Sequence, residues 1–233
     1  MLQKMKAFYA RVLQCISAHA KWIVLAAMAL AVVPFLLISI YSRPCVDDFS
    51  YSFSLYHMLQ SGGGNLFALL KEAVCVDIRY YHSWQGLYTS VFVLALQPGI
   101  FGERYYFIGA VLLMVLMAAC LYYFVSACFD RLGVSLSKAC CAAILLTALL
   151  QGLPSMTEGL YWFNGAWNYT PFFFLILVNI GLVLRFTAPS GKRRQLVCAV
   201  ILSFLISGGN HVTSFLNILV LLLAALISRR KAL

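Results

Sequence analysis

Long uninterrupted runs of apolar residues constrain this chain more than any other feature of its sequence. Residues 22–41 and 105–128 are each long enough to cross a bilayer core as a helix, which takes about 20 residues. Four shorter runs follow, at residues 139–153, 171–186, 196–206 and 212–227. Charged residues make up only 10% of the chain, which excludes a soluble enzyme, a disordered tail and a free nucleic-acid-binding domain. We predict an all-α polytopic membrane helix bundle with about six transmembrane helices, forming a single transmembrane domain.

Basic residues separate these apolar runs and predict the orientation of the chain. Most of the 17 Lys and Arg residues fall in four segments, residues 1–21, 129–138, 185–195 and 229–231. Cytoplasmic loops carry an excess of such residues. Residues 87–96 are also apolar, but if they crossed the membrane, the later basic segments would lie outside the cytoplasm. The same rule therefore predicts that residues 87–96 do not cross. We therefore expect a multi-pass protein of the cell membrane with both termini in the cytoplasm and residues 42–104 in one extracytoplasmic loop.

The segments outside the spans show helical patterns of their own. Residues 1–21 combine basic side chains with apolar ones at helical spacing and predict a cytoplasmic amphipathic segment, although a basic topogenic flank would explain the charges equally well. In the outer loop we expect amphipathic surface helices over residues 47–60 and 81–97, with a flexible turn at 61–65 between them. Residues 105–233 then hold the remaining spans.

Asp47 and Asp48 are the first candidates for chemistry, directly after the first span. One interpretation is helix capping, with Asp47 as the N-cap residue and Asp48 in the first turn. The other is a catalytic base or a site for a divalent cation, because adjacent carboxylates repel and raise one pKa. Local chemistry leaves both interpretations open.

Two aromatic clusters flank the predicted spans on the outer side. Aromatic residues at a membrane interface commonly form a belt. Flat rings beside short polar donors would also suit a neutral carbohydrate. The candidate sugar-binding residues are Tyr51, His82, Trp84, Gln85, Glu158, Tyr161, Trp162, Asn164 and Asn168. We expect Asp48, His82 and Glu158 to approach one cavity.

A glycine pair interrupts the last two apolar runs at residues 207–211. The run before it, residues 196–206, spans only about 16 Å as a helix, and basic residues at both outer ends require the chain to return. We predict that the turn lies below the outer surface and lines the floor of the outer cavity, with Asn210 and His211 facing Asp47. The alternative is a simple external turn over a thinned bilayer.

Other side chains narrow the possible functions. No ionisable residue lies in the interior of the six apolar runs, which argues against a proton-coupled transporter or pump.

Cys45 and Cys75 are the two cysteines of the outer loop. A disulfide between them is compatible with an oxidising compartment, and the sequence does not decide the question.

Five short motifs together resemble an uncharacterised family of bacterial multi-span membrane proteins. They are CVDDFSYS at 45–52, YHSWQG at 81–86, LQPGIFGE at 96–103, YWFNG at 161–165 and GGN at 208–210. That family in turn resembles GT-C glycosyltransferases, which move sugars from polyprenyl-phosphate carriers onto acceptors outside the cytoplasm. The resemblance matches Asp47 and Asp48 with the acidic motif of those enzymes. Family members are usually longer, so the chain is expected to be a truncated member.

The resemblance predicts a GT-C-like membrane glycosyltransferase. Asp47 or Asp48 would deprotonate an acceptor hydroxyl or hold a divalent cation. The partners would be the lipid bilayer, a polyprenyl-phosphate sugar and a glycan acceptor. The alternative is a non-catalytic integral membrane protein that binds glycan or lipid in envelope assembly, in which the aspartates only cap a helix.

Overall fold

The computed structural model describes residues 2–230, with side-chain positions for residues 18–226. Within that range all regular secondary structure is helical. Three segments are long and apolar enough to cross a membrane: Ala18–Ser39 within α1 (Leu2–Ser39), Glu103–Leu132, which contains α5 (Ile108–Leu132), and α7 (Phe163–Phe186). The predicted class, an all-α membrane protein, is confirmed to this extent.

The N-terminal segment continues directly into the first long helix. The backbone of α1 is helical from Leu2 to Ser39, without a break near residue 21. The amphipathic face predicted for residues 1–21 depends on side chains that, up to residue 17, lie outside the described residues.

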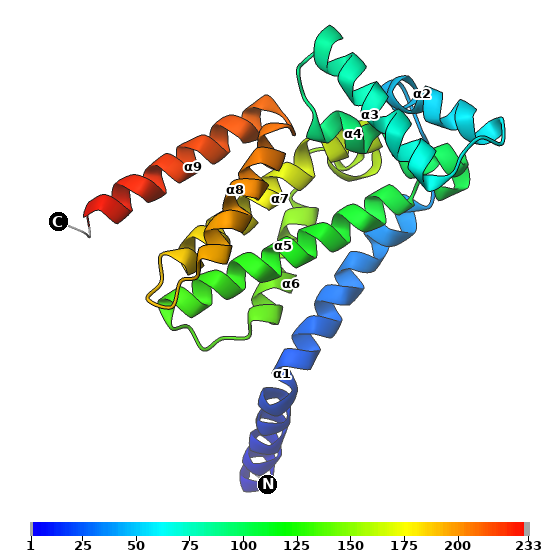
Figure 1. Cartoon of the computed structure of the whole chain (residues 1–233). Coiled ribbons are helices and arrows are strands. Elements are labelled where there is room, and N and C mark those ends of the chain that lie inside the picture. The colour runs from blue at the N-terminus through cyan, green and yellow to red at the C-terminus, as the bar shows by residue number, and fades with distance from the viewer. Residues whose placement is uncertain (1, 231–233) are drawn as a thin grey trace.

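Helices α5 and α7 pack against each other and form the centre of the bundle (Figure 1). Two glycines allow this close approach. A Cβ atom on Gly109 would lie 2.5 Å from the ring of Phe163, and one on Gly181 would lie 2.9 Å from the ring of Tyr123. Small residues at such contacts are what lets transmembrane helices approach closely.

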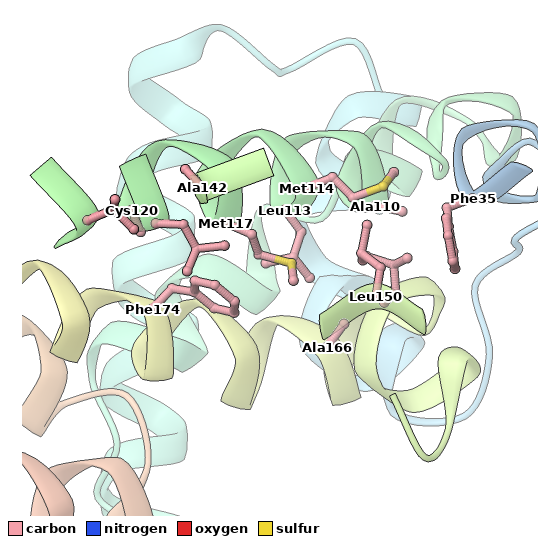
Figure 2. Packing of buried hydrophobic residues seen from close by; sticks show 13 residues of the cluster. Phe35, Ala110, Leu113, Met114, Met117, Cys120, Ala142, Leu150, Ala166 and Phe174 are labelled. Carbon is pink, nitrogen blue, oxygen red and sulfur yellow. The ribbon is translucent and has the colours of Figure 1, made fainter. Parts of the chain in front are cut away.

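The largest buried cluster fills the space between four helices. Figure 2 shows Leu113 and Met117 of α5, Leu150 of α6 (Lys138–Gln151) and Phe174 of α7 in this cluster, together with Phe35 of α1. Because dense packing of apolar side chains is sensitive to changes of one methylene, this cluster fixes how the helices lie against one another.

The remaining membrane candidates are shorter. Helices α6 and α8 (Arg193–Ser207) have 14 and 15 residues, or about 21 and 22 Å, which is less than a core of about 30 Å. Helix α9 (His211–Arg230) has 20 residues. Two hydrogen bonds join α8 and α9 to α7: Asn179 Nδ2 donates to Asn217 Oδ1 of α9 at 2.8 Å and to Ser203 Oγ of α8 at 2.9 Å. Such amide and hydroxyl contacts hold helices together in lipid.

Residues 42–104 form a folded layer with its own apolar core. Its elements are α2 (Asp47–Gln60), α3 (Leu66–Ser83), α4 (Thr89–Ala95), η1 (Pro98–Phe101) and η2 (Glu103–Tyr105). Leu55, Ala73, Val76 and Val91 are buried together between α2, α3 and α4. In Figure 1 these three helices gather at one end of the bundle, at the upper right.

The structure confirms the bounds of one predicted helix and corrects those of the other. Helix α2 has the predicted bounds, 47–60. A single helix over 81–97 is wrong, because α3 ends at Ser83 and α4 begins only at Thr89. Gly86 between them has a φ of 65°, a left-handed conformation that interrupts a helix. The longest helix of the layer, α3, was not predicted.

The two ends of the bundle differ in composition. We call the end that carries α2, α3 and α4 the loop end. At the other end, which we call the basic end, Asp130 near the end of α5 pairs with Lys138 at the start of α6 and with Arg185 of α7, the latter at 3.4 Å. These ion pairs bring the basic segments 129–138 and 185–195 to the same end.

Candidate functional site

Asp48 lies at the centre of the loop end. Its side chain is 2% exposed. Its Oδ2 atom accepts hydrogen bonds from the hydroxyl of Tyr106 at 2.5 Å and from the backbone N–H of Cys45 at 3.0 Å. Its Oδ1 atom accepts the backbone N–H of Asn164 at 2.9 Å. One carboxylate therefore joins α2 to the starts of α5 and α7.

This arrangement satisfies the N-terminus of α7. The first N–H groups of a helix have no intrahelical acceptor. The N–H of Phe163 donates to the Tyr106 hydroxyl at 2.7 Å, and the N–H of Asn164 donates to Asp48. A carboxylate in this place is also favoured by the helix dipole. Burial raises the pKa of Asp48, while its three hydrogen bonds favour the charged form and oppose that rise.

Asp48 thus helps to cap the N-terminus of α7. The prediction that Asp47 is the N-cap residue of α2 is wrong. The N-cap residue is Val46, whose φ of 47° is unusual for a branched side chain. Asp48, in the first turn as predicted, reaches back to the N–H of Cys45. Asp47 itself is exposed.

The two aspartates do not fit the divalent cation considered for them. Both oxygens of Asp48 accept hydrogen bonds from protein groups, which leaves only Asp47 facing solvent. Among the described residues no group of three or more His, Cys, Asp or Glu side chains is arranged to hold a metal ion.

Two residues that sequence reasoning missed complete this site. Gln97, which is 2% exposed, donates through Nε2 to the carbonyl of Asp48 at 2.8 Å and to Ser52 Oγ at 2.7 Å. Tyr106 supplies the hydroxyl described above. A lone Gln at the end of an apolar stretch and a Tyr at the start of a span were the available signals, and both are also typical of membrane interfaces.

A separate cavity of about 320 Å³ surrounds Glu158. Glu158 is exposed and lies in η3 (Thr157–Tyr161), a single π-helical turn, a feature that is frequent at functional sites. The rings of Trp162 and Tyr169 line the same cavity, as does Thr170. The arrangement offers a carboxylate beside two aromatic rings.

Gly165 and the residues around it determine the position of the Trp162 indole at this cavity. A Cβ atom on Gly165 would lie 2.6 Å from the Trp162 ring, so only glycine allows the indole to lie where it does. The Nε1–H of Trp162 is buried and has no hydrogen-bond partner among the described residues. Thr170 Oγ1 donates to the carbonyl of Gly159 at 3.1 Å and thereby holds the π-helical turn.

The single cavity expected for Asp48, His82 and Glu158 does not form. Neither Asp48 nor His82 lines the cavity of Glu158. His82, Trp84 and Gln85 are exposed at the end of α3 and in the turn after it. The physical reason is that the hydrogen bonds of Asp48 turn its carboxylate into the protein interior.

The other candidate residues have mainly structural contacts. The ring of Tyr51 lies 4.5 Å from that of Tyr80, centre to centre. Tyr161 donates through its hydroxyl to the carbonyl of Phe35 at 3.1 Å. Asn164 is buried, and the carbonyl of Asn168 accepts Asn210 Nδ2 at 2.8 Å.

The glycine turn before α9 is buried in protein and has no contact with Asp47 among those described, while its depth in a membrane stays a prediction. The carbonyl of Gly208 accepts hydrogen bonds from three successive N–H groups, those of Tyr88, Thr89 and Ser90, at 2.8–3.2 Å. A Cβ atom on Gly209 would lie 2.4 Å from the ring of Phe172. The space at this turn is therefore filled by Phe172 of α7 and by Tyr88 and Thr89 of the loop end.

Asn210 and His211 separate at this turn. Asn210 is buried and caps α9, because its Oδ1 accepts the N–H of Thr213 at 2.9 Å. His211 is exposed. The expectation that both face Asp47 is not met, since Asn210 contacts Asn168 instead. In the outer loop, Cys45 and Cys75 are both free thiols.

Comparison of the chain with protein-family models, with curated proteins and with solved structures finds no match. The resemblance drawn from the five motifs therefore stays a prediction. What can be said of function rests on the geometry of the loop end and of the Glu158 cavity.

Proposed function

We propose that this membrane protein is a GT-C-like glycosyltransferase that holds a sugar in the Glu158 cavity. The observation that carries the proposal is the meeting of an exposed carboxylate with the rings of Trp162 and Tyr169 in one cavity. Sugars stack their apolar faces on aromatic rings and donate hydroxyl hydrogen bonds to carboxylates.

The proposed topology places this cavity outside the cytoplasm. Six helices, α1 and α5 to α9, cross the membrane, with the basic end in the cytoplasm as the positive-inside rule requires. The ion pairs of Asp130 support this, because they hold two basic segments at the same end. At the loop end, the hydrogen bonds from Tyr88, Thr89 and Ser90 to Gly208 hold residues 42–104 against the turn before α9.

The transfer step would use Asp47, the exposed member of the aspartate pair; because Asp47 does not line the Glu158 cavity, the proposal requires the anomeric carbon of the bound sugar to extend beyond the cavity to Asp47. An acceptor hydroxyl oxygen attacks the anomeric carbon of a polyprenyl-phosphate sugar and gives its proton to the Asp47 carboxylate. The bond from the anomeric carbon to the phosphate oxygen breaks, and the lipid phosphate leaves with the electron pair. General base catalysis of this kind contributes about 10²–10⁴-fold to the rate.

A second candidate function is non-catalytic binding of glycan or lipid in envelope assembly. The geometry of Asp48 favours it, because a buried carboxylate with three hydrogen bonds from protein groups is explained by its structural role alone. Under this alternative the Glu158 cavity still binds sugar, while Asp47 has no role in chemistry.

Three variants in lipid nanodiscs separate these functions, with sugar binding measured by saturation-transfer NMR and sugar transfer by release of polyprenyl phosphate. Glu158→Gln should weaken binding by about tenfold or more, because a charged acceptor is lost. Asp47→Asn should keep binding and lose transfer. Glu72→Gln, in α3 and outside the cavity, serves as the matched control.

The outcomes are distinct. Unchanged binding in Glu158→Gln would refute the sugar site. Unchanged transfer in Asp47→Asn, with binding intact, would refute Asp47 as the base. Sugar binding with no transfer by the unmodified protein, across a panel of polyprenyl-phosphate donors, would favour the non-catalytic alternative.

A further inference from the structure

A second cavity, of about 500 Å³, lies at the basic end of the bundle. It forms where the end of α5, the end of α7 and the start of α8 meet. Asp130, Arg131, Arg185 and Gln195 line it. Figure 1 shows the end of α5 and the connection from α7 to α8 at the same end of the molecule. This cavity is distinct from the Glu158 cavity: its wall is polar, and it lies at the basic end of the bundle.

The cations of this cavity outnumber its carboxylate. Asp130 pairs with Lys138 and with Arg185, and the Arg185 guanidinium also lies 4.5 Å from the centre of the Tyr123 ring. Arg185 therefore lies between Asp130 and the Tyr123 ring, at the wall of this cavity. Arg131 is exposed and forms no ion pair within the described residues, so its guanidinium is free to bind an anion. A guanidinium matches phosphate oxygens in a bidentate manner.

The start of α8 reaches this cavity through Gln195. The first N–H groups of this 15-residue helix, in Arg193 and Arg194, have no intrahelical acceptor. Gln195, in the same turn, lines the cavity and accepts the Lys192 N–H through Oε1 at 2.7 Å. Helix N-termini favour anions through these donors and through the helix dipole.

An apolar groove continues from this cavity along the same three helices. It measures about 350 Å³ and is lined by Tyr123 of α5, Val178 and Leu182 of α7, and Cys198 and Ile201 of α8. The groove residue nearest to the polar cavity on each helix, Tyr123, Leu182 or Cys198, lies two to four residues, at most about one turn, from a residue of that cavity. Ile201 is 57% exposed, so this part of the groove is open at the surface of the bundle.

We propose that the two adjoining spaces bind one anionic phospholipid. Its phosphate lies in the polar cavity between Arg131, Arg185 and the start of α8, and one acyl chain lies in the apolar groove. A free phosphate would need only the first space, and an uncharged lipid only the second. Basic pockets between helices at the cytoplasmic side are suited to anionic head groups. The proposal is independent of the sugar site.

Native mass spectrometry of the full chain in neutral detergent tests this proposal. The protein is titrated with phosphatidylglycerol, with phosphatidylcholine of the same acyl chains, and with glycerol phosphate, which has the head-group phosphate and no chain. We expect phosphatidylglycerol to bind at least about tenfold more tightly than either of the others. Arg131→Gln should weaken phosphatidylglycerol binding about fivefold, the effect of one cation near a lipid surface.

Two further variants keep the test decisive. Arg79→Gln removes an exposed arginine of α3, far along the chain from the cavity, and should leave lipid binding unchanged. Cys198→Trp fills the apolar groove and should weaken binding of phosphatidylglycerol even though every cation is kept.

Each contrary result removes part of the site. Equal affinity for phosphatidylglycerol and phosphatidylcholine, or an unchanged Arg131→Gln variant, would overturn the anionic head-group site. Glycerol phosphate binding as tightly as the lipid, or an unchanged Cys198→Trp variant, would show a phosphate site without an acyl chain and would overturn the lipid assignment.

Discussion

Each end of the bundle uses one aspartate to join three elements, but the two aspartates work in opposite ways. At the loop end, Asp48 is 2% exposed and accepts hydrogen bonds from neutral donors, two backbone N–H groups and a tyrosine hydroxyl. At the basic end, the Asp130 side chain is 50% exposed and pairs with the cations Lys138 and Arg185.

The difference shows how each end is stabilised. Removing a buried acceptor leaves its donors unpaired away from water, which costs the full desolvation of those groups. An exposed ion pair contributes little, because water and salt replace it readily. The loop end is therefore built to hold one arrangement, while the basic end keeps charges available for a ligand.

The largest effect is expected at Asp48. Asp48→Ala leaves the N–H groups of Cys45 and Asn164 and the hydroxyl of Tyr106 without an acceptor, and should destabilise the protein by on the order of 3 kcal/mol. Thermal unfolding in detergent, followed by circular dichroism, measures this. Asp47→Ala is the matched control and should stay within about 0.5 kcal/mol. Equal losses in both variants would contradict the central role of Asp48.

The next effect concerns the packing of the turn before α9 against α7. Gly209→Ala would place a Cβ atom 2.4 Å from the Phe172 ring, and overpacking of this kind costs about 1–3 kcal/mol. The same unfolding measurement applies, with Gly63→Ala as the control, since its nearest atom would be 3.7 Å away. Wild-type stability of Gly209→Ala would show that the turn is not held by Phe172.

Asp77 gives the loop end a pH dependence between about pH 4 and pH 6. Burial raises the pKa of Asp77 to about 6, and its Oδ1 has no partner among the described residues. The folded state therefore favours the protonated form of Asp77. The stabilisation from this group is fully present below a pH of about 4 and is lost as the pH rises through about 6.

Asp77→Asn should accordingly be more stable than the unmodified protein at pH 7 and no more stable at pH 4. Unfolding curves across this range, with Glu72→Gln on the same helix as the control, test the sign. A variant that is less stable at pH 7 would mean that the charged form of Asp77 has a partner in the folded protein.

The smallest change is expected for Asp130→Asn at the basic end. The carboxylate is exposed, so its ion pairs with Lys138 and Arg185 should lower the melting temperature far less than the loss of Asp48 does. The small difference should shrink further as salt is added. A loss as large as that of Asp48→Ala would remove the contrast between the two ends.

The sequence by itself determined the elements whose signal is local. The apolar runs at 22–41 and 105–128 predicted two of the three long helices, because about 20 consecutive apolar residues suffice for such a helix. The helix at 47–60 was predicted with its observed bounds. The break between α3 and α4 was missed because its signal, the left-handed Gly86, looks the same in sequence as a tolerated glycine.

Only the tertiary structure decided what the polar residues do. Capping and chemistry were equally compatible with Asp48 in its local sequence, and its decisive partners, Tyr106 and Asn164, lie 58 and 116 residues away. The choice of which aspartate is buried depends on which one faces the start of α7. In the same way, Glu158 acquires its aromatic cavity, and Arg131 its polar cavity, from helices that meet only once the chain has folded. The hydrophobicity of a segment can be read from consecutive residues, whereas a site consists of residues that are distant in sequence and come together only in the folded chain.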